Sequence, residues 1–259
     1  MKSLHQTLPA LIGATLLIAL PAHGQGRPND PAFNNLASSP KGGNGHWVGS
    51  LGFGMTVSRG NSDSTQASLS ADAVRALRDS RIALHGLFIR NTSNGDTTAD
   101  NDLAEARYER NFAQAWFGFG DATFERDPFK DLDLRQTYGT GAGYRLLRAE
   151  GLQLNVYAGL AYTFEDHKVA SDAKGVEPMI GNDFTYALSE TATLSQRWVL
   201  FPNTVGVGGV RSVFQIDLST KITDRFGLQL SVLNKFREKV LSGEKKSDTI
   251  IFTGITANF

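Results

Sequence analysis

The feature that most constrains this chain is an alternation of apolar and polar side chains, with a period of two, from residue 47 to 259. It is clearest in GLQLNVYAGLAYTFED, residues 151–166, and it returns in LDLRQTYGTGAGYRLL, 132–147, and RFGLQLSVLNKFRE, 225–238. Successive side chains of a β-strand point to opposite faces, so each segment has one apolar face and one polar or small face. The sequence therefore predicts a protein built of strands.

The alternating segments indicate about twelve strands, an even number of the kind that bacterial outer-membrane barrels contain. Most of them are longer than the five or six residues typical of strands in soluble proteins. We expect the strands near residues 47–59, 65–77, 81–91, 102–112, 115–125, 132–148, 152–168, 176–187, 191–201, 205–221, 225–240 and 248–259.

The connections between the expected strands alternate in length. Longer segments such as TSNGDTTAD, VASDAKG and LSGEKKS follow odd-numbered strands, whereas RDS, AEG and TDR follow even-numbered ones. Only PNT, after the ninth strand, departs from this order. Long outward loops and short periplasmic turns are typical of membrane barrels. The predicted fold is all-β, a closed antiparallel up-and-down transmembrane β-barrel; a soluble β-sandwich or lipocalin-like barrel is the alternative.

The N-terminal region has the pattern of an export signal. Lys2 precedes the apolar run LPALIGATLLIAL, residues 8–20, which is too short to span a membrane as a helix, and Ala22-His23-Gly24 fits a cleavage site. We expect a signal peptide over 1–24, a disordered arm over 25–46 and the barrel over 47–259. A buried helix or an anchor is the alternative for the first segment. The predicted location is the cell outer membrane.

Composition removes several classes of function. The chain has 26 basic and 26 acidic residues, so no charge excess favours nucleic acid. It has no cysteine, which excludes disulfides, thiolate metal sites, a cysteine nucleophile and a lipid-modified N-terminal cysteine. The expected partners are outer-membrane lipid, the barrel-assembly machinery and small solutes or ions, and we expect a monomer without cofactors.

Charged residues within the strands are the first candidate site. An Arg or Lys facing lipid at the membrane midplane costs about 2–4 kcal/mol, so charges in these strands should face the lumen. Opposite charges there could line a narrow aqueous path, or they could pair across strands and close the lumen. The predicted lumen-lining residues are Glu105, Arg107, Glu109, Arg135, Arg145, Arg211 and Asp217.

Two further features are candidates at the ends of strands. Gly60, Asn61 and Asp63 should form the first outward turn, where glycine and asparagine tolerate left-handed backbone angles; a ligand contact is the alternative. Phe259 is an aromatic residue at the end of the last alternating strand. In this it resembles the C-terminal signal that the barrel-assembly machinery recognises. It could equally be an aromatic residue at the membrane interface.

Catalytic and metal signals are weak. His46, His85 and His167 remain after the signal peptide, and no serine motif accompanies them, so we expect His85 to be a polar lumen residue and the protein not to be an enzyme. Asp96, Asp100 and Asp102 fall in one expected outward loop that could hold calcium, but the spacing of a calcium hand is missing. We expect a solvated loop and no metal site.

The segment SLGFGMTVSRGNSDSTQASLSADAVR, the repeated hairpins and the final ITANF together resemble one family. It is the group of exported proteins named salt-induced outer membrane proteins, classed as a domain of unknown function. The resemblance covers about residues 47–259 and implies an outer-membrane location and a role in envelope stress, without catalytic residues or a substrate. We expect a passive pore for small solutes or ions, or a closed structural barrel. The alternatives are an outer-membrane lipid hydrolase and a soluble periplasmic ligand-binding barrel.

Overall fold

The structure is a computed structural model that describes residues 45–58, 64–205, 208–240 and 245–259. The expected signal peptide and nearly all of the expected arm lie outside these ranges. Within them, no helix is long and apolar enough to cross a membrane. The strands are β1 Trp47–Ser58, β2 Ser64–Ala76, β3 Ser80–Ser93, β4 Asp96–Asn111, β5 Trp116–Asp127, β6 Leu132–Ala149, β7 Leu152–His167, β8 Ala173–Ala187, β9 Ala192–Phe201, β10 Arg211–Lys221, β11 Phe226–Arg237 and β12 Ser247–Asn258, with a 3-10 turn η1 at Pro128–Lys130.

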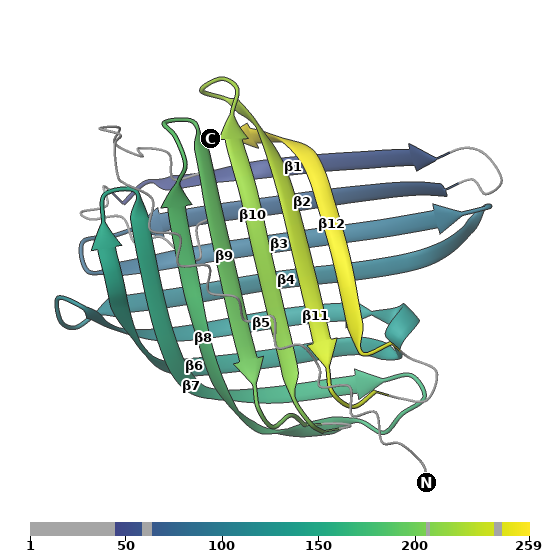
Figure 1. Cartoon of the computed structure of the whole chain (residues 1–259). Helices are drawn as coiled ribbons and strands as arrows, with labels where there is room; N and C mark the ends of the chain where they lie inside the picture. The colour runs from purple at the N-terminus through teal and green to yellow at the C-terminus, as the bar shows by residue number, and fades with distance from the viewer. Residues whose placement is uncertain (1–44, 59–63, 206–207, 241–244) are drawn as a thin grey trace, which may run out of the picture.

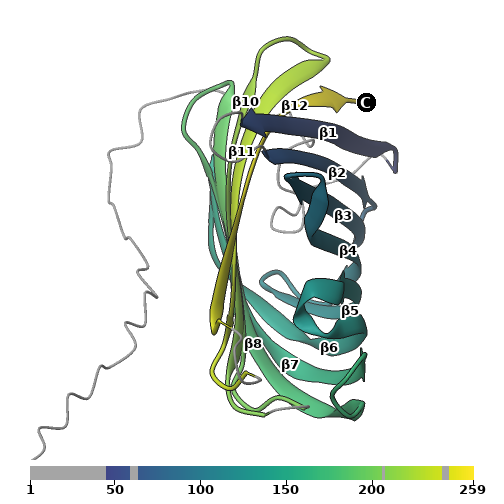
Figure 2. The ribbon, with the colours of Figure 1, turned by 90° about the vertical axis from the view of Figure 1, so that its right-hand side faces the viewer.

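Each strand pairs antiparallel with its neighbours in the chain, and β1 pairs with β12 to close the barrel. The predicted fold class, a closed antiparallel barrel of twelve strands, is confirmed. Figure 1 shows β8–β11 lying across β1–β7 at a wide angle, and Figure 2 shows these two groups as facing walls. Because the walls face each other closely, side chains from opposite strands can meet in the lumen.

The alternation of side chains sorts each strand between an inner and an outer face. In β7, Asn155, Tyr157 and Thr163 are buried in the barrel, whereas Val156 and Leu160 are exposed outside. The same order runs along β5, where Phe117 and Phe119 are buried and Trp116 is exposed. Apolar side chains thus face outward and charged side chains face the lumen, which is the opposite of their arrangement in a soluble protein.

The β3–β4 connection is much tighter than expected. β4 begins at Asp96 rather than near Asp102, so TSNGDTTAD is not an outward loop as predicted. Asn94 and Gly95 both have positive φ, 51° and 91°, which is the backbone of a two-residue hairpin turn. Asp96, Asp100 and Asp102 therefore lie on a strand, where Asp100 and Asp102 contact Arg126 at 3.3 and 3.4 Å.

The β9–β10 connection differs in the other direction. β10 begins at Arg211 rather than near Val205, so the outward connection covers 202–210. Gly208 and Gly209 have positive φ, and the Gly209 carbonyl accepts a hydrogen bond from the Thr204 amide at 3.0 Å. These turns interrupt the alternation. The short PNT loop was thus a misplaced strand end, and this outward connection is longer than the two-residue β3–β4 turn.

Aromatic side chains inside the barrel pack against glycines of the neighbouring strand. A methyl group on Gly143 of β6 would lie 2.1 Å from Cζ of Phe117, which has no exposed surface. Glycine lets the ring lie flat against the wall at this position. The ring belongs to an apolar core cluster within the lumen, comprising Phe117, Phe119, Tyr157, Ala161, Met179, Val199 and Phe201.

We expect Gly143→Ala to destabilise the barrel by about 1–3 kcal/mol, because the added methyl group overpacks a filled interior. The matched control is Gly120→Ala on β5, where the nearest atom to a new methyl group is the Gly139 carbonyl oxygen, at 3.9 Å. Urea unfolding in lipid vesicles measures both variants. Equal stability of the two would contradict the packing of Phe117 on Gly143.

Candidate functional site: the charged interior of the barrel

The residues predicted to line the lumen lie on the inner face of their strands. Six are buried, and the Glu105 side chain is 14% exposed and bonded to Arg197. They come from β4, β6 and β10 and are Glu105, Arg107, Glu109, Arg135, Arg145, Arg211 and Asp217. The structure brings most of them into ion pairs with acids and bases from other strands.

One group of charges lies toward the short-turn end of the barrel. Arg107 Nε donates to Glu109 Oε1 at 2.8 Å, and Arg81 lies 3.3 Å from the same oxygen. The Arg107 guanidinium also stacks on Phe119 and Tyr157, with its carbon 4.2 and 4.6 Å from the ring centres. A guanidinium held between a carboxylate and two rings is a rigid part of the wall.

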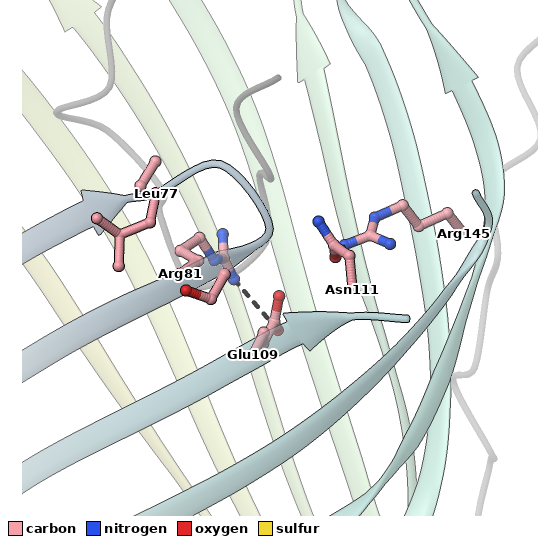
Figure 3. Close-up of a pocket in the computed structure, with 7 residues that line it drawn as sticks. Leu77, Arg81, Glu109, Asn111 and Arg145 are labelled. Carbon is pink, nitrogen blue, oxygen red and sulfur yellow. Dashed lines mark hydrogen bonds and ion pairs between the residues drawn. The ribbon is translucent and has the colours of Figure 1, made fainter. Parts of the chain in front are cut away.

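A pocket opens beside this group (Figure 3). The Arg145 guanidinium donates to Asn111 Oδ1 and lies 4.8 Å from the centre of the Phe117 ring. Figure 3 shows Arg81 and Glu109 paired on one side, with Asn111 and Arg145 facing them. The lining residues are Ala76, Leu77, Ser80, Arg81, Glu109, Asn111 and Arg145.

Among the described residues, three ion pairs cross the lumen between strands at least four places apart in the barrel. Lys235 Nζ of β11 lies 2.6 Å from Glu125 Oε1 of β5, and these strands stand opposite each other in the order of twelve. Arg197 of β9 reaches Glu105 of β4 at 2.7 Å. Arg237 of β11 reaches Glu165 of β7 at 2.8 Å. We call these contacts the cross-lumen pairs. They place charged side chains directly across any path along the barrel axis.

A network toward the long-loop end joins these pairs to the wall. Arg135 donates to Glu125 and to Glu165, both at 2.7 Å, so one guanidinium bridges two of the cross-lumen acids. Glu177 accepts from Arg211 at 3.0 Å and from Thr163 at 2.5 Å. Four bases and three acids take part, and each base contacts at least one of the acids.

Between the two charged groups lies a smaller polar set. His85 Nδ1 is 2.8 Å from Asp72 Oδ1, and both side chains are largely buried. Asp217 accepts hydrogen bonds from Ser231 and from Gln215, the latter at 3.1 Å. His85 thus lies in the lumen as expected, and its partner in the structure is a carboxylate.

In the described connections, acidic side chains accept hydrogen bonds from backbone amides, and Asp131 accepts two. Asp131, between η1 and β6, accepts hydrogen bonds from the amides of Ala170 at 2.9 Å and Val169 at 2.7 Å. These donors, Ala170 first, stabilise the carboxylate and hold the pKa of Asp131 below its ordinary value. His167 Nδ1 donates a hydrogen bond to the Asp131 carbonyl oxygen at 2.8 Å. The β5–β6 and β7–β8 connections are joined in this way.

The remaining sequence candidates lie at the barrel ends or outside the description. Gly60, Asn61 and Asp63 fall outside the described residues. Phe259 exchanges backbone hydrogen bonds with Gly49, both at 3.0 Å, and its ring is exposed. Its part in assembly stays a prediction. Among the described residues, no group of three or more His, Asp or Glu side chains could hold a metal ion.

The acids and bases that complete the network were not among the predicted residues. They share the inner-face parity of their strands, as Lys235 does with Ser231 and Leu233, so alternation could have marked them as inward. The cross-lumen partners could not be found in this way, because those pairs join distant strands. Pairs between neighbouring strands, such as Arg81 with Glu109, depend on a register that alternation alone does not give. The missed residues are Asp72, Arg81, Glu125, Glu165, Glu177, Asp183, Arg197, Lys235 and Arg237.

Comparison with known proteins gives one family match. The model of the family described as "Protein of unknown function, DUF481" matches residues 51–259. No curated protein matches the sequence.

Several solved structures are similar in outline. The translocator domain of the autotransporter NalP from Neisseria meningitidis is 12% identical, with 82% of this chain and 88% of that chain covered and a TM-score of 0.46. The NanC porin is 11% identical, with 80% and 98% covered and a TM-score of 0.47. The beta domain of the Bordetella autotransporter BrkA is 10% identical, with 82% and 97% covered and a TM-score of 0.37. The identities are too low to transfer any residue role to this chain.

We expect a double-mutant cycle of Lys235→Met and Glu125→Gln to give a coupling energy of about 0.5–3 kcal/mol, because the two side chains are in direct contact. The double variant should lose less stability than the sum of the two single losses, since each single change leaves one charge in the lumen without this partner. Urea unfolding of the four proteins in lipid vesicles gives the energies.

The matched control is Arg126→Met with Asp102→Asn, an ion pair on the outer face whose Arg side chain is 45% exposed. An exposed pair should couple by only about 0.2–1 kcal/mol. A lumen cycle with no coupling would show that Lys235 and Glu125 do not meet in the folded barrel.

Proposed function

This chain belongs to the DUF481 family of proteins of unknown function, and we propose that it is an integral barrel of the bacterial outer membrane whose lumen is closed at rest. It performs no catalysis in this proposal. It acts as a structural barrel of the envelope, and the passage of small solutes or ions requires the cross-lumen pairs to separate. The salt-stress role implied by the family resemblance is part of the same proposal.

The outer surface supports the membrane location. Large apolar side chains on the outer face include Leu51, Phe53 and Met55 of β1, and Leu228 and Leu230 of β11. In hydrocarbon, every backbone polar group needs a partner within the protein, and a closed barrel supplies those partners from neighbouring strands. A soluble periplasmic barrel would leave this apolar surface in water, so the membrane location is the better proposal.

Aromatic residues on the outer face support the same location. Tyr138 and Phe164 contact edge to face with ring centres 6.4 Å apart, toward the long-loop end of the barrel. Trp116 and Tyr144 make a similar contact at 5.0 Å toward the short-turn end. Two separated aromatic groups are expected where a barrel wall meets the two membrane–water interfaces.

The cross-lumen pairs are the observation that carries the closed state. Each puts an acid and a base from separate walls within 2.8 Å of each other or less, and the apolar core around Phe117 and Tyr157 fills more of the lumen. A lumen with balanced charge offers no excess field to select anions or cations. Buried pairs are also screened by salt much less than exposed pairs.

The hydrolase alternative has less support. A lipid hydrolase of the serine type needs a histidine beside a serine and an opening toward the lipid. His85 lies inside the barrel, with its Nδ1 held by Asp72. We therefore assign His85 a structural role in the lumen.

Planar-bilayer recording of the refolded mature chain tests the closed lumen. We expect no steady conductance from the wild-type barrel, and discrete steps from a variant that removes two cross-lumen pairs, Glu105→Ser/Arg197→Ser/Glu125→Ser/Lys235→Ser. Serine removes both charge and bulk, so water can replace the side chains.

The control variant is Asp100→Ser/Arg126→Ser, which removes an ion pair outside the lumen and should stay non-conducting. Heat-dependent gel mobility shows that each variant has folded. Steady open steps from the wild-type barrel would overturn the closed state, and a chain that stays soluble without detergent would overturn the membrane location.

A further inference from the structure

The strands β1 and β12 form the closing seam of the barrel, and their backbones are paired over only part of its length. Backbone pairing runs from Ser50↔Asn258 to Phe53↔Ile255, and Gly49 and Phe259 continue it by two backbone hydrogen bonds at the short-turn end. β1 continues to Ser58 and β12 begins at Ser247, and the described parts of the two strands make no further pairs. By contrast, β1 and β2 pair along the whole of β1. Figures 1 and 2 both show β1 and β12 diverging beyond this point.

Glycines mark the place where the two strands separate. A methyl group on Gly54 would lie 2.6 Å from the Thr253 carbonyl oxygen, and one on Gly254 would lie 2.6 Å from that of Phe53. The two backbones therefore cross in close contact, which only residues without a Cβ permit. The Phe252 ring, 2% exposed, lies on the lumen side of this crossing, 3.2 Å from the Cβ position of Gly54.

Beyond the crossing, a side chain occupies the place of the missing ladder. The Ile251 carbonyl of β12 accepts a hydrogen bond of 3.5 Å from Nε2 of Gln66, a residue of β2. An unpartnered backbone group costs several kcal/mol in hydrocarbon, and one long side-chain bond is a weak substitute for a ladder. The long-loop half of the seam is thus the part of the wall that separates most readily.

An apolar strip in the lumen reaches this half of the seam through Ile250 of β12. Its buried members come from β3 and β11, and its partly buried members include Ile250 of β12. It is separate from the apolar cluster around Phe117. We define the apolar strip as Leu87, Ile89, Leu103, Val213, Leu233 and Ile250. Phe252 follows Ile250 on the inner face of β12 and continues the strip to the crossing.

The outer side of the seam is apolar, and its long-loop end is cationic. Phe53, Met55 and Ile251 expose 57–59% of their surface on the outer face beside the seam. Lys245 and Lys246, at the long-loop end of β12, are both exposed. A molecule lying here would meet apolar side chains along its length and cationic side chains at one end.

We propose that the long-loop half of the β1–β12 seam is a lateral passage, through which the acyl chain of an anionic amphiphile enters the apolar strip from the membrane. Lys245 and Lys246 hold the anionic headgroup. Lipid tails are as apolar as the strip, so the acyl chain gains little free energy when it moves from the bilayer into the strip. The contact of the headgroup with the two lysines therefore supplies the recognition. The inference rests on the proposed membrane location and is independent of whether the lumen conducts ions.

Photolabelling of the refolded mature chain in phosphatidylcholine vesicles tests the passage. The probe is palmitic acid with a diazirine near the end of the chain, and mass spectrometry locates the adducts. We expect adducts on the apolar strip, including Leu233 and Ile250, in addition to the outer face. A folded barrel with adducts on Met55 and Ile251 alone would overturn the passage.

A disulfide across the seam provides the decisive variant, because the chain has no cysteine of its own. Continuing the β1–β12 register pairs Met55 with Thr253, both on the outer face. We expect oxidised Met55→Cys/Thr253→Cys to lose the strip adducts and the reduced protein to regain them. The control is Leu69→Cys/Phe88→Cys, across the fully paired β2–β3 ladder, which should keep the adducts when oxidised. Strip adducts that persist in the oxidised seam variant would overturn the proposal.

Two further arms test the headgroup and the source of the chain. Lys245→Gln/Lys246→Gln should lower strip labelling by palmitate but not by its methyl ester. Lys168→Gln/Lys174→Gln, in the β7–β8 connection and at the start of β8, should change neither. Unchanged labelling by palmitate would overturn the role of the two lysines. The same diazirine chain in phosphatidic acid distinguishes a membrane lipid from a free fatty acid, and labelling by either supports the passage. Failure to insert into vesicles, seen by gel mobility, would instead count against the proposed membrane location.

Discussion

The backbone hydrogen-bond ladder around the barrel is the constraint on which the rest of the structure depends. Each strand satisfies its amides and carbonyls on two neighbours, and the β1–β12 contact returns the sheet to itself. A closed sheet can present apolar side chains outward because it leaves few backbone groups without partners. The partly paired β1–β12 seam matters because its hydrogen-bond ladder is the shortest in the barrel.

Closure also determines what the interior must do. Because the barrel is flattened into two facing walls, inward charges from opposite strands lie within reach of one another. Arg135 shows the consequence, since it bridges Glu125 and Glu165 while Lys235 and Arg237 reach the same acids from the other wall. Charges that could have lined a water path instead hold the walls together, and the cluster around Phe117 and the apolar strip interrupt this charged interior.

Strand prediction succeeded where alternation was unbroken and failed where turn geometry was decisive. β6 and β7 were placed to within a residue at each end, because side chains alternate along their whole length. β4 was begun too late, since Asp96–Asp102 looks like a polar loop although Asn94-Gly95 makes a two-residue turn. β10 was begun too early, because Val205 continues an apparent alternation that the turn at Gly208 and Gly209 ends.

The sequence by itself determined the fold class and the face on which each strand residue lies, because a two-residue period assigns sides without any knowledge of neighbours. It placed Glu105 and Arg107 inside, for example, before any partner was known. Only the tertiary structure decided which charges meet. Lys235 and Glu125 are 110 residues apart in the chain, and they are brought together by closure and flattening of the barrel, which no local pattern records.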